Sequence, residues 1–387
     1  MFWLTLYLWD VIRCIFRMLC TVSSKENSRS KNKIKDTESR QKFGFSSTTT
    51  EVLQGIDLRG KTIAITGTTS GIGLETARSL ALHGAHVVMM NRNVELSENV
   101  RRKICDEVDS DKEHSPGETL TWGNVMDRNL PHFVGIRTFK NMNPQVDIIE
   151  MDLSSLKSVR QAAEEFISKG WPLDVLILNA GLTSWGKEQS ADGHERTFAV
   201  NHLGHFYLTN LLMDKLRASA PSRLVVVSSE LHAITGIRAS DDTESKLKKL
   251  VPTPGVKYAS VRLYAYSKLC NVLFANKVHR LAHQNGVHTY VLHPGVVHTD
   301  IARGNKFLAR LFHFFATPYS KSAEQGAATT VYCAATPYTK NESGLYYENC
   351  GASDKRLDKA LAHDQLLQDA LWQQSMEFIK EFETAHK

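Results

Sequence analysis

Two residues in the second half of the chain, Tyr264 and Lys268, have the types and the spacing for proton transfer. They are four positions apart in LYAYSKLCN, so on a helix they share one face and the ammonium can lie near the phenol. A phenol titrates near ~10 in water, and a neighbouring positive charge is expected to lower that pKa toward neutral pH. The pair predicts a general acid and base acting on a substrate oxygen. A competing phenol, Tyr266, is two positions from Lys268 and should face elsewhere.

A glycine-rich turn at residues 66–73 (TGTTSGIG) is the second candidate site. Gly67 permits a tight turn, Gly71 lets the backbone approach a pyrophosphate, and Gly73 lets the following helix pack close to the preceding strand. The first NH groups of that helix would then face phosphate oxygens. The turn therefore predicts a bound dinucleotide. Its other candidate contacts are Thr69, Ser70 and Ile72.

The end of the next predicted strand distinguishes the two nicotinamide dinucleotides. Asp or Glu there would bind the ribose 2′-hydroxyl of NAD, whereas a neutral residue with Arg nearby accommodates the 2′-phosphate of NADP. The chain has Met90-Asn91-Arg92 at this point, and Arg92 supplies a bidentate phosphate partner. We therefore expect NADP(H) as the cofactor. An ordinary surface arginine is the alternative for Arg92 taken alone.

Positioning these groups requires strands and helices in alternation, and the chain shows that pattern from about residue 52. Continuous apolar strands between helices indicate a parallel sheet covered on both faces, so we predict a single α/β, doubly wound, Rossmann-like domain. The predicted strands are 62–66, 86–90, 146–150, 174–178, 223–228, 288–292 and 344–347. The predicted helices are 72–84, 93–106, 155–169, 194–218 and 260–284. Ligands of such sheets bind at the carboxyl ends of the strands, where Ser228 and Ser229 also stand.

Two segments depart from this alternation. Residues 108–145 have mixed charge, three prolines and no sustained period, which predicts an insertion, either a surface loop or a docked lid or partner site. Residues 355–385 place apolar side chains at helical spacing, which predicts a C-terminal helix packed on the domain or on a partner.

The first 20 residues are strongly apolar but carry Asp10, Arg13 and Arg17, which share one face of a helix. This pattern predicts a helix in the membrane interface, with a membrane span or a helix packed on the protein's own domain as alternatives. Residues 25–42 are polar and basic, which favours the cytosolic side. We expect an anchor at 1–22, a linker at 23–50 and a catalytic domain at 51–387 that faces the cytosol from the endoplasmic reticulum membrane.

Composition narrows the classes of partner. The net charge is only +6, and beyond residue 45 no cluster of Lys and Arg marks one element, which argues against nucleic acid. The six cysteines have no CxxC pair and no metal-ligand spacing, so we expect reduced thiols and no metal site. A homodimer remains open.

Taken together, the motifs resemble the short-chain dehydrogenase/reductase family over about residues 58–350. They are the TGxxxGxG turn, Asn179-Ala180-Gly181 after the fourth strand, the serine pair, YxxxK and Pro294-Gly295. Residues 201–208 (NHLGHFYL) and 325–335 further resemble the retinol dehydrogenase group and the oxidoreductase domain of WW-domain-containing oxidoreductases. Residues 1–50 lack tryptophans at the spacing of a WW module, so recognition of proline motifs is not implied.

For catalysis, the resemblance implies a Ser-Tyr-Lys mechanism. Tyr264 would give or take the proton, Lys268 would lower its pKa and bind the nicotinamide ribose, and Ser229 would orient the substrate oxygen. Asn201 would hold a water in the proton relay. Taken singly, Ser229 and Asn201 could instead be satisfied polar core residues.

For the cofactor, the resemblance implies contacts at four further positions. Asp152 would meet the adenine and Asn179 the adenosine ribose, while the backbone near Val296 and the Thr299 side chain would reach the nicotinamide. Asp152 has the alternative role of capping the next helix. The implied enzyme interconverts an alcohol and a carbonyl on a lipophilic substrate such as a retinoid, a steroid or a long-chain carbonyl. A membrane-tethered NADP(H)-binding scaffold is the alternative, as is, more remotely, a nucleotide-sugar epimerase-like enzyme.

Overall fold

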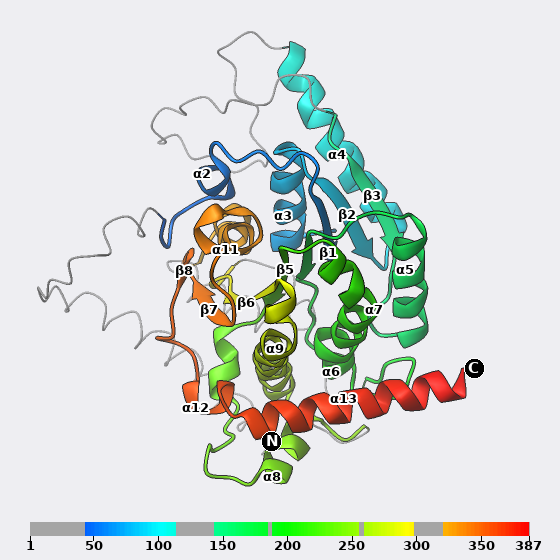
Figure 1. The fold of residues 1–387 in the computed structure, drawn as a ribbon, viewed down its shortest axis with the longest axis vertical. Coiled ribbons are helices and arrows are strands. Elements are labelled where there is room, and N and C mark those ends of the chain that lie inside the picture. Colours follow the sequence, from blue (N-terminus) through cyan, green and yellow to red (C-terminus); the bar gives the residue numbers. More distant parts are fainter. Residues whose placement is uncertain (1–42, 114–142, 185–187, 255–258, 298–319, 387) are drawn as a thin grey trace, which may run out of the picture.

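The computed structural model describes residues 43–113, 143–184, 188–254, 259–297 and 320–386 (Figure 1). Its strands are β1 (Thr62–Thr66), β2 (His86–Asn91), β3 (Val146–Glu150), β4 (Val175–Leu178), β5 (Ser222–Val227), β6 (Val287–His293), β7 (Leu345–Glu348) and β8 (Gly351–Ala352). They form one sheet in the order β3-β2-β1-β4-β5-β6-β7-β8, in which only the pair β7–β8 is antiparallel. The predicted doubly wound α/β domain is confirmed.

Helices cover both faces of the sheet (Figure 1). The longer ones are α3 (Gly71–Leu82), α4 (Val94–Glu113), α5 (Leu156–Ser168), α7 (Gly204–Ala218), α9 (Ser260–Ala282), α11 (Ala323–Ala335) and α13 (Gln365–Ala385). The shorter ones are α2 (Thr49–Leu53), α6 (Arg196–Phe198), α8 (Thr243–Leu250) and α12 (Lys359–Ala362). A π-helical turn spans Ala199–Leu203, and 3-10 helices span Glu230–Ile234, His283–Asn285 and Pro337–Thr339.

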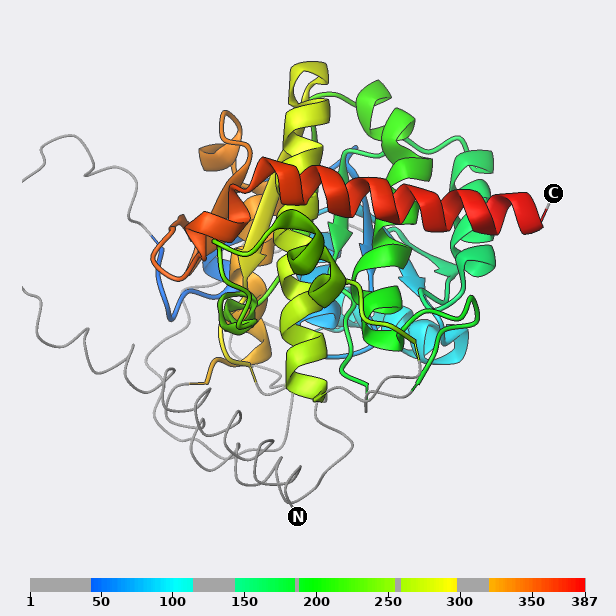
Figure 2. The ribbon, with the colours of Figure 1, turned by 90° about the horizontal axis from the view of Figure 1, so that it is seen from below.

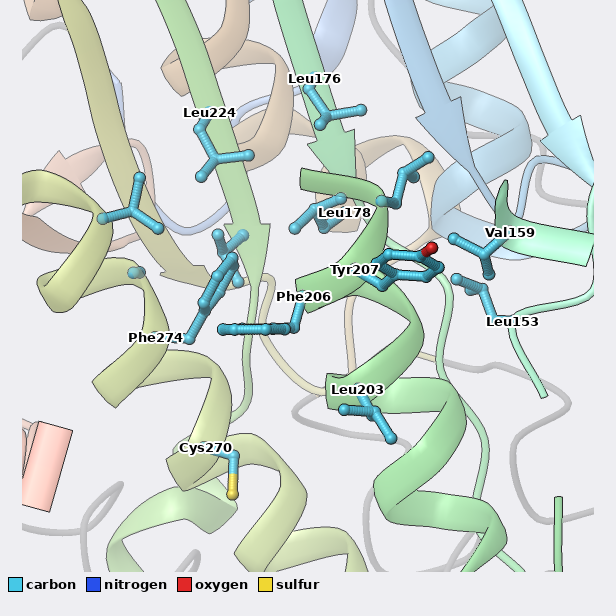
Figure 3. Close-up of a cluster of buried hydrophobic side chains, with 14 of the residues drawn as sticks. Leu153, Val159, Leu176, Leu178, Leu203, Phe206, Tyr207, Leu224, Cys270 and Phe274 are labelled. Carbon is cyan, nitrogen blue, oxygen red and sulfur yellow. The ribbon is translucent and has the colours of Figure 1, made fainter. Parts of the chain in front are cut away.

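The core has two layers because successive strand residues point to opposite faces of the sheet. In β1, Ala64 belongs to the layer under α5, α7 and α9, whereas Ile63 and Ile65 belong to the layer under α3 and α11. Figure 3 shows the first layer, in which Phe206 of α7 and Phe274 of α9 pack beside leucines of β4 and β5. Helices thus press on both faces, which explains why β1 is buried at every position.

Helix α13 lies across the outer side of α9 and α8 (Figure 2). Its Leu367 and Leu371 are fully buried, and Trp372 meets the ring of Phe206 edge-on at 4.8 Å. The predicted C-terminal helix is confirmed, but it begins at Gln365 because the Asp364 side chain caps it by accepting from the Leu367 amide at 3.0 Å.

One other boundary differs from the sequence prediction, and four short elements or helices were not predicted. Helix α4 continues to Glu113 and so enters the segment predicted as an insertion from residue 108. Polar and charged residues dominate the sequence after Ile104, so the final turns carry no periodic apolar signal. The short strand β8, and helices α2, α8 and α11, were not predicted; β8 has only two residues, too few for any pattern.

No helix among the described residues is both long enough and apolar enough to cross a bilayer. The predicted anchor at 1–22 and most of its linker lie outside the described residues, and so does most of the predicted insertion.

Candidate active site

The glycine turn joins β1 to α3 in a conformation that only glycine accommodates. Gly67 and Gly71 have φ values of +73° and +58°. A Cβ added to Gly73 would lie 2.0 Å from the Gly67 carbonyl oxygen, so helix and turn are in close contact. Ser70 is the N-cap of α3, yet its side chain makes no capping hydrogen bond. The first NH groups of α3 therefore keep their donors for an anion, as a pyrophosphate requires.

Thr66 and Asn179 hold this turn against the end of β4. The Thr66 hydroxyl oxygen accepts from the backbone amides of Asn179 and Ala180, both at 3.0 Å. The Asn179 amide nitrogen donates to the carbonyls of Thr66 and Gly67, also at 3.0 Å. Asn179 was expected to contact the adenosine ribose, and in the structure its side chain holds the backbone of the glycine turn.

Asn91 at the end of β2 is a site residue that the sequence analysis did not single out. Its side-chain oxygen accepts from the Thr68 amide at 2.8 Å, and its nitrogen donates to the hydroxyls of Thr68 at 2.7 Å and Ser97 at 2.9 Å. Asn91 therefore orients the glycine turn from the side of β2. Arg92 follows it directly and is exposed to solvent at the same edge.

Asp152 lies just after β3 and is half-buried. Its carboxylate accepts from the Ser154 amide at 2.8 Å and the Ser154 hydroxyl at 2.7 Å, whereas Ser155 is the N-cap of α5. Asp152 thus orders the turn before the helix without capping it.

The catalytic candidates meet where β5 ends and α9 begins. The Tyr264 phenol lies close enough to the Ser229 hydroxyl for Ser229 to lower the pKa of the phenol. The Lys268 ammonium lies 5.4 Å from the centre of the Tyr264 ring and donates to the Val227 carbonyl at 3.0 Å. The neighbouring Ser228 donates instead to the Lys268 carbonyl at 2.8 Å. The geometry thus separates the two serines: Ser229 faces the phenol and Ser228 supports α9.

The pKa of this phenol differs from the sequence expectation. Burial raises the pKa of Tyr264 to about 12, and the hydrogen bond with Ser229 only partly opposes this effect. Burial also lowers the pKa of Lys268 to about 8. Loss of hydration around the phenol dominates its pKa, in place of the lowering by Lys268 that the sequence suggested. At neutral pH the phenol therefore holds its proton and can donate it.

Asn201 lies in the π-helical turn, a feature frequent at functional sites. Its side chain accepts from the Leu182 amide at 2.8 Å and donates to the Leu182 carbonyl at 2.9 Å and the Ser267 hydroxyl at 3.0 Å. Gly181 lies between Asn201 and Lys268: a Cβ there would be 3.5 Å from Asn201 Oδ1 and 3.3 Å from Lys268 Nζ. The structure thus places Asn201 near Lys268, on either side of Gly181 in the segment that follows β4.

The segment after β6 approaches the glycine turn from the opposite side. A Cβ on Gly326 would contact both Val297 at 2.5 Å and Ile72 at 3.3 Å, so these two side chains lie close together. The Val296 carbonyl accepts from the Lys321 amide at 2.7 Å, which ties this segment to the start of α11. Thr299 lies outside the described residues.

Within the described ranges, no group of three or more His, Cys, Asp or Glu side chains could hold a metal ion. Burial lowers the pKa of His202, His205 and His293 to about 3, so each is a neutral ring at physiological pH.

Comparisons with known proteins agree with this geometry. The sequence profile described as short chain dehydrogenase matches residues 61–115 and 125–241. The chain is 40% identical to chicken WW domain-containing oxidoreductase, over 88% of this chain and 73% of that protein. It is 34% identical to mouse retinol dehydrogenase 12, over 84% of this chain and 88% of that protein.

Solved structures share the fold. A putative uncharacterized protein from Mycobacterium paratuberculosis is 26% identical with a TM-score of 0.58, over 87% of this chain and 98% of that chain. L-Sorbose reductase from Gluconobacter frateurii, solved with NADPH and L-sorbose, is 17% identical with a TM-score of 0.52, over 77% of this chain and 98% of that chain.

Proposed function

This chain belongs to the short-chain dehydrogenase family, and on that premise we propose that it is an NADP(H)-dependent oxidoreductase interconverting an alcohol and a carbonyl on a lipophilic substrate. The observation that carries the proposal is the Tyr264 phenol beside the Ser229 hydroxyl, with the Lys268 ammonium 5.4 Å from the centre of its ring. This arrangement aims two hydroxyl groups at one substrate oxygen.

The chain's own residues supply the proton and hold the oxygen. When bound, the nicotinamide supplies or accepts the hydride. In the direction of reduction, the Tyr264 O–H gives its proton to the substrate oxygen as negative charge develops there, and Ser229 donates a second hydrogen bond to that oxygen. Lys268, held by the Val227 carbonyl, keeps a positive charge beside the phenol and stabilises the phenolate that remains. Oxidation runs through the same groups in reverse.

Several features of the chain fit a phosphorylated dinucleotide. The first turn of α3 has uncapped NH donors, and no Cβ can be accommodated at Gly73. The end of β2 carries Asn91 and the exposed Arg92 in place of a carboxylate. We propose that Arg92 binds the 2′-phosphate and so selects NADP(H). The sorbose reductase that shares this fold was solved with NADPH.

Replacing Arg92 with Ala should raise the KM for NADPH by about 10- to 100-fold, because a charge-assisted hydrogen bond to phosphate contributes about 1.5–3 kcal/mol. The KM for NADH should change less than threefold, since NADH has no 2′-phosphate. Initial rates with both cofactors measure the ratio. Arg101→Ala is the matched control, because Arg101 lies on α4 and pairs with Glu98. A KM ratio that stays at its wild-type value in the Arg92 variant would contradict the assignment.

A direct assay tests the function itself. Purified full-length protein is given NADPH with retinal, steroid ketones and aliphatic aldehydes, and NADPH consumption is followed. Turnover on one of these classes supports the enzyme and identifies its substrate class. Tight NADPH binding with no turnover on any of them would favour the tethered scaffold.

We also propose that residues 1–22 hold the protein on a membrane, with the catalytic domain on the cytosolic side of the endoplasmic reticulum. Deleting residues 1–22 should move at least about 90% of the protein from the membrane pellet to the supernatant, because an interfacial helix binds through its buried apolar area. Fractionation of cells followed by immunoblotting measures this shift. Continued pelleting of the deletion variant would place the anchor elsewhere, with the apolar stretch at 303–316 as the next segment to remove.

A further inference from the structure

His205 connects the cofactor turn to the catalytic asparagine, although neither its type nor its position suggests this from sequence. It lies in the first turn of α7, and its Nε2 is 2.9 Å from the Thr66 hydroxyl. Its Nδ1 is 3.2 Å from the Asn201 carbonyl oxygen. Thr66 is the last residue of β1, and Asn201 stands in the π-helical turn, so one imidazole joins two elements that are far apart in the chain.

The partners of Thr66 determine which ring nitrogen carries the proton. The Thr66 oxygen already accepts from the amides of Asn179 and Ala180, and therefore has its own hydrogen to donate. The acceptor of that hydrogen is His205 Nε2, which must be unprotonated. His205 Nδ1 then carries the hydrogen and donates it to the Asn201 carbonyl. In this assignment every hydrogen has one acceptor, and all the hydrogen bonds run in one direction from the amides to the Asn201 carbonyl.

The surroundings keep the ring in this neutral form. His205 is 2% exposed, and burial together with the charge of Lys268 lowers its pKa to about 3. A second proton would remove the acceptor of Thr66 and place a positive charge near the catalytic ammonium. The ring therefore acts as a fixed spacer with a donor at one end and an acceptor at the other.

We propose that His205 is a positioning residue that couples the cofactor-binding turn to the Asn201 carbonyl and thereby aligns the catalytic residues. The inference rests on the proposed oxidoreductase function. Through Thr66, His205 holds the glycine turn that would face the cofactor. Through the Asn201 carbonyl, it holds the π-helical turn, from which the Asn201 side chain binds Leu182, the residue after Gly181 near Lys268. Loss of the hydrogen bond at Nε2 should therefore disturb the glycine turn, whereas loss of the one at Nδ1 should disturb the π-helical turn.

Two substitutions separate these consequences. In H205N, the amide nitrogen takes the place of Nδ1 and keeps the bond to Asn201, while Thr66 loses its acceptor. In H205Q, the amide oxygen takes the place of Nε2 and keeps the bond to Thr66, while the Asn201 carbonyl loses its donor. We expect H205N to raise the Kd for NADPH about tenfold with kcat within threefold of wild type. We expect H205Q to lower kcat at least tenfold with the Kd for NADPH within threefold.

His202→Gln is the matched control. His202 is also a buried neutral histidine, but its Nε2 contacts Ser375 of α13 and its Nδ1 has no partner among the described residues. This variant should keep both kcat and the Kd for NADPH within threefold of wild type. Equal effects of H205N and H205Q on both quantities, or no effect of either, would overturn the proposal in favour of plain packing.

A measurement on the wild-type protein tests the inference without turnover. Full-length protein labelled with ¹⁵N-histidine should show one ring, absent from the spectrum of H205N, that is protonated at Nδ1, bare at Nε2 and unchanged between pH 5.5 and 8. A ring protonated at Nε2, or one that titrates in this range, overturns the inference even if H205N and H205Q fail to fold. If wild-type protein shows this ring but turns over no substrate, the proposed function fails while the assigned hydrogen bonds stand.

Discussion

Replacing Tyr264 with Phe is expected to lower kcat for carbonyl reduction by about 10³-fold, because it removes the group that gives its proton to the substrate oxygen. The change deletes a single oxygen, which lies beside Ser229, and leaves the ring that Lys268 faces. The Kd for NADPH should therefore stay within a few fold of wild type. Stopped-flow NADPH oxidation gives kcat, and quenching of protein fluorescence gives the Kd.

Tyr266→Phe is the control for this prediction, since Tyr266 is two residues further along α9 and its side chain belongs to the hydrophobic core. It should retain at least about a third of the wild-type kcat. Full activity of Tyr264→Phe would contradict the assigned proton donor. Loss of NADPH binding together with activity would mean that the phenol supports the cofactor site as well.

The state of this phenol has a consequence for the direction of reaction. With its pKa raised to about 12 by burial, Tyr264 holds its proton throughout the neutral range and is ready to act as an acid. An alcohol substrate would instead require a phenolate, which the buried site disfavours before any substrate or cofactor binds. The chain alone therefore holds Tyr264 in the form from which carbonyl reduction starts, and the direction of net turnover follows the concentrations of cofactor and substrate.

The placement of the candidate catalytic residues and of the glycine turn could be predicted from sequence because the signals are local. Tyr264 and Lys268 are one helical turn apart, and the glycines of the turn stand between a strand and a helix, so short-range spacing places them. The sheet could be predicted for the same reason: runs such as residues 62–66 are apolar on both faces only when helices cover both.

Contacts between distant parts of the chain gave no such signal. Asn91 reaches Thr68 across 23 positions and His205 reaches Thr66 across 139, and no periodicity reports either pair. The raised pKa of Tyr264 was also missed, since an i to i+4 spacing says that Lys268 is near but not how far the fold withdraws the phenol from water. The π-helical turn at Asn201 has the same apolar pattern as the helix around it, so the sequence does not distinguish it from an α-helix.

Acidification from pH 7.5 to 5.5 should lower the free energy of unfolding by about 4 kcal/mol through His202, His205 and His293 alone. Burial lowers the pKa of each to about 3 in the folded protein, whereas an exposed imidazole in the unfolded chain titrates near ~6.5. Below that pH the unfolded chain binds protons that the folded protein rejects, so stability is lost as the pH falls. Each histidine contributes about 1.4 kcal/mol over this interval, against a total stability of about 5–15 kcal/mol.

Urea unfolding of the full chain at both pH values measures this loss, and His202→Gln should reduce it by about a third. The readout is the difference between the two pH values, so a general loss of packing does not mimic it. Phe274→Leu is the matched control, because the Phe274 ring packs against His202 but has no titratable group. This variant should lower the free energy of unfolding by the same amount at both pH values. If the variant without His202 loses as much stability on acidification as wild type does, that histidine is already charged in the folded protein, and its place among the rings of Phe198, Phe206 and Phe274 needs another explanation.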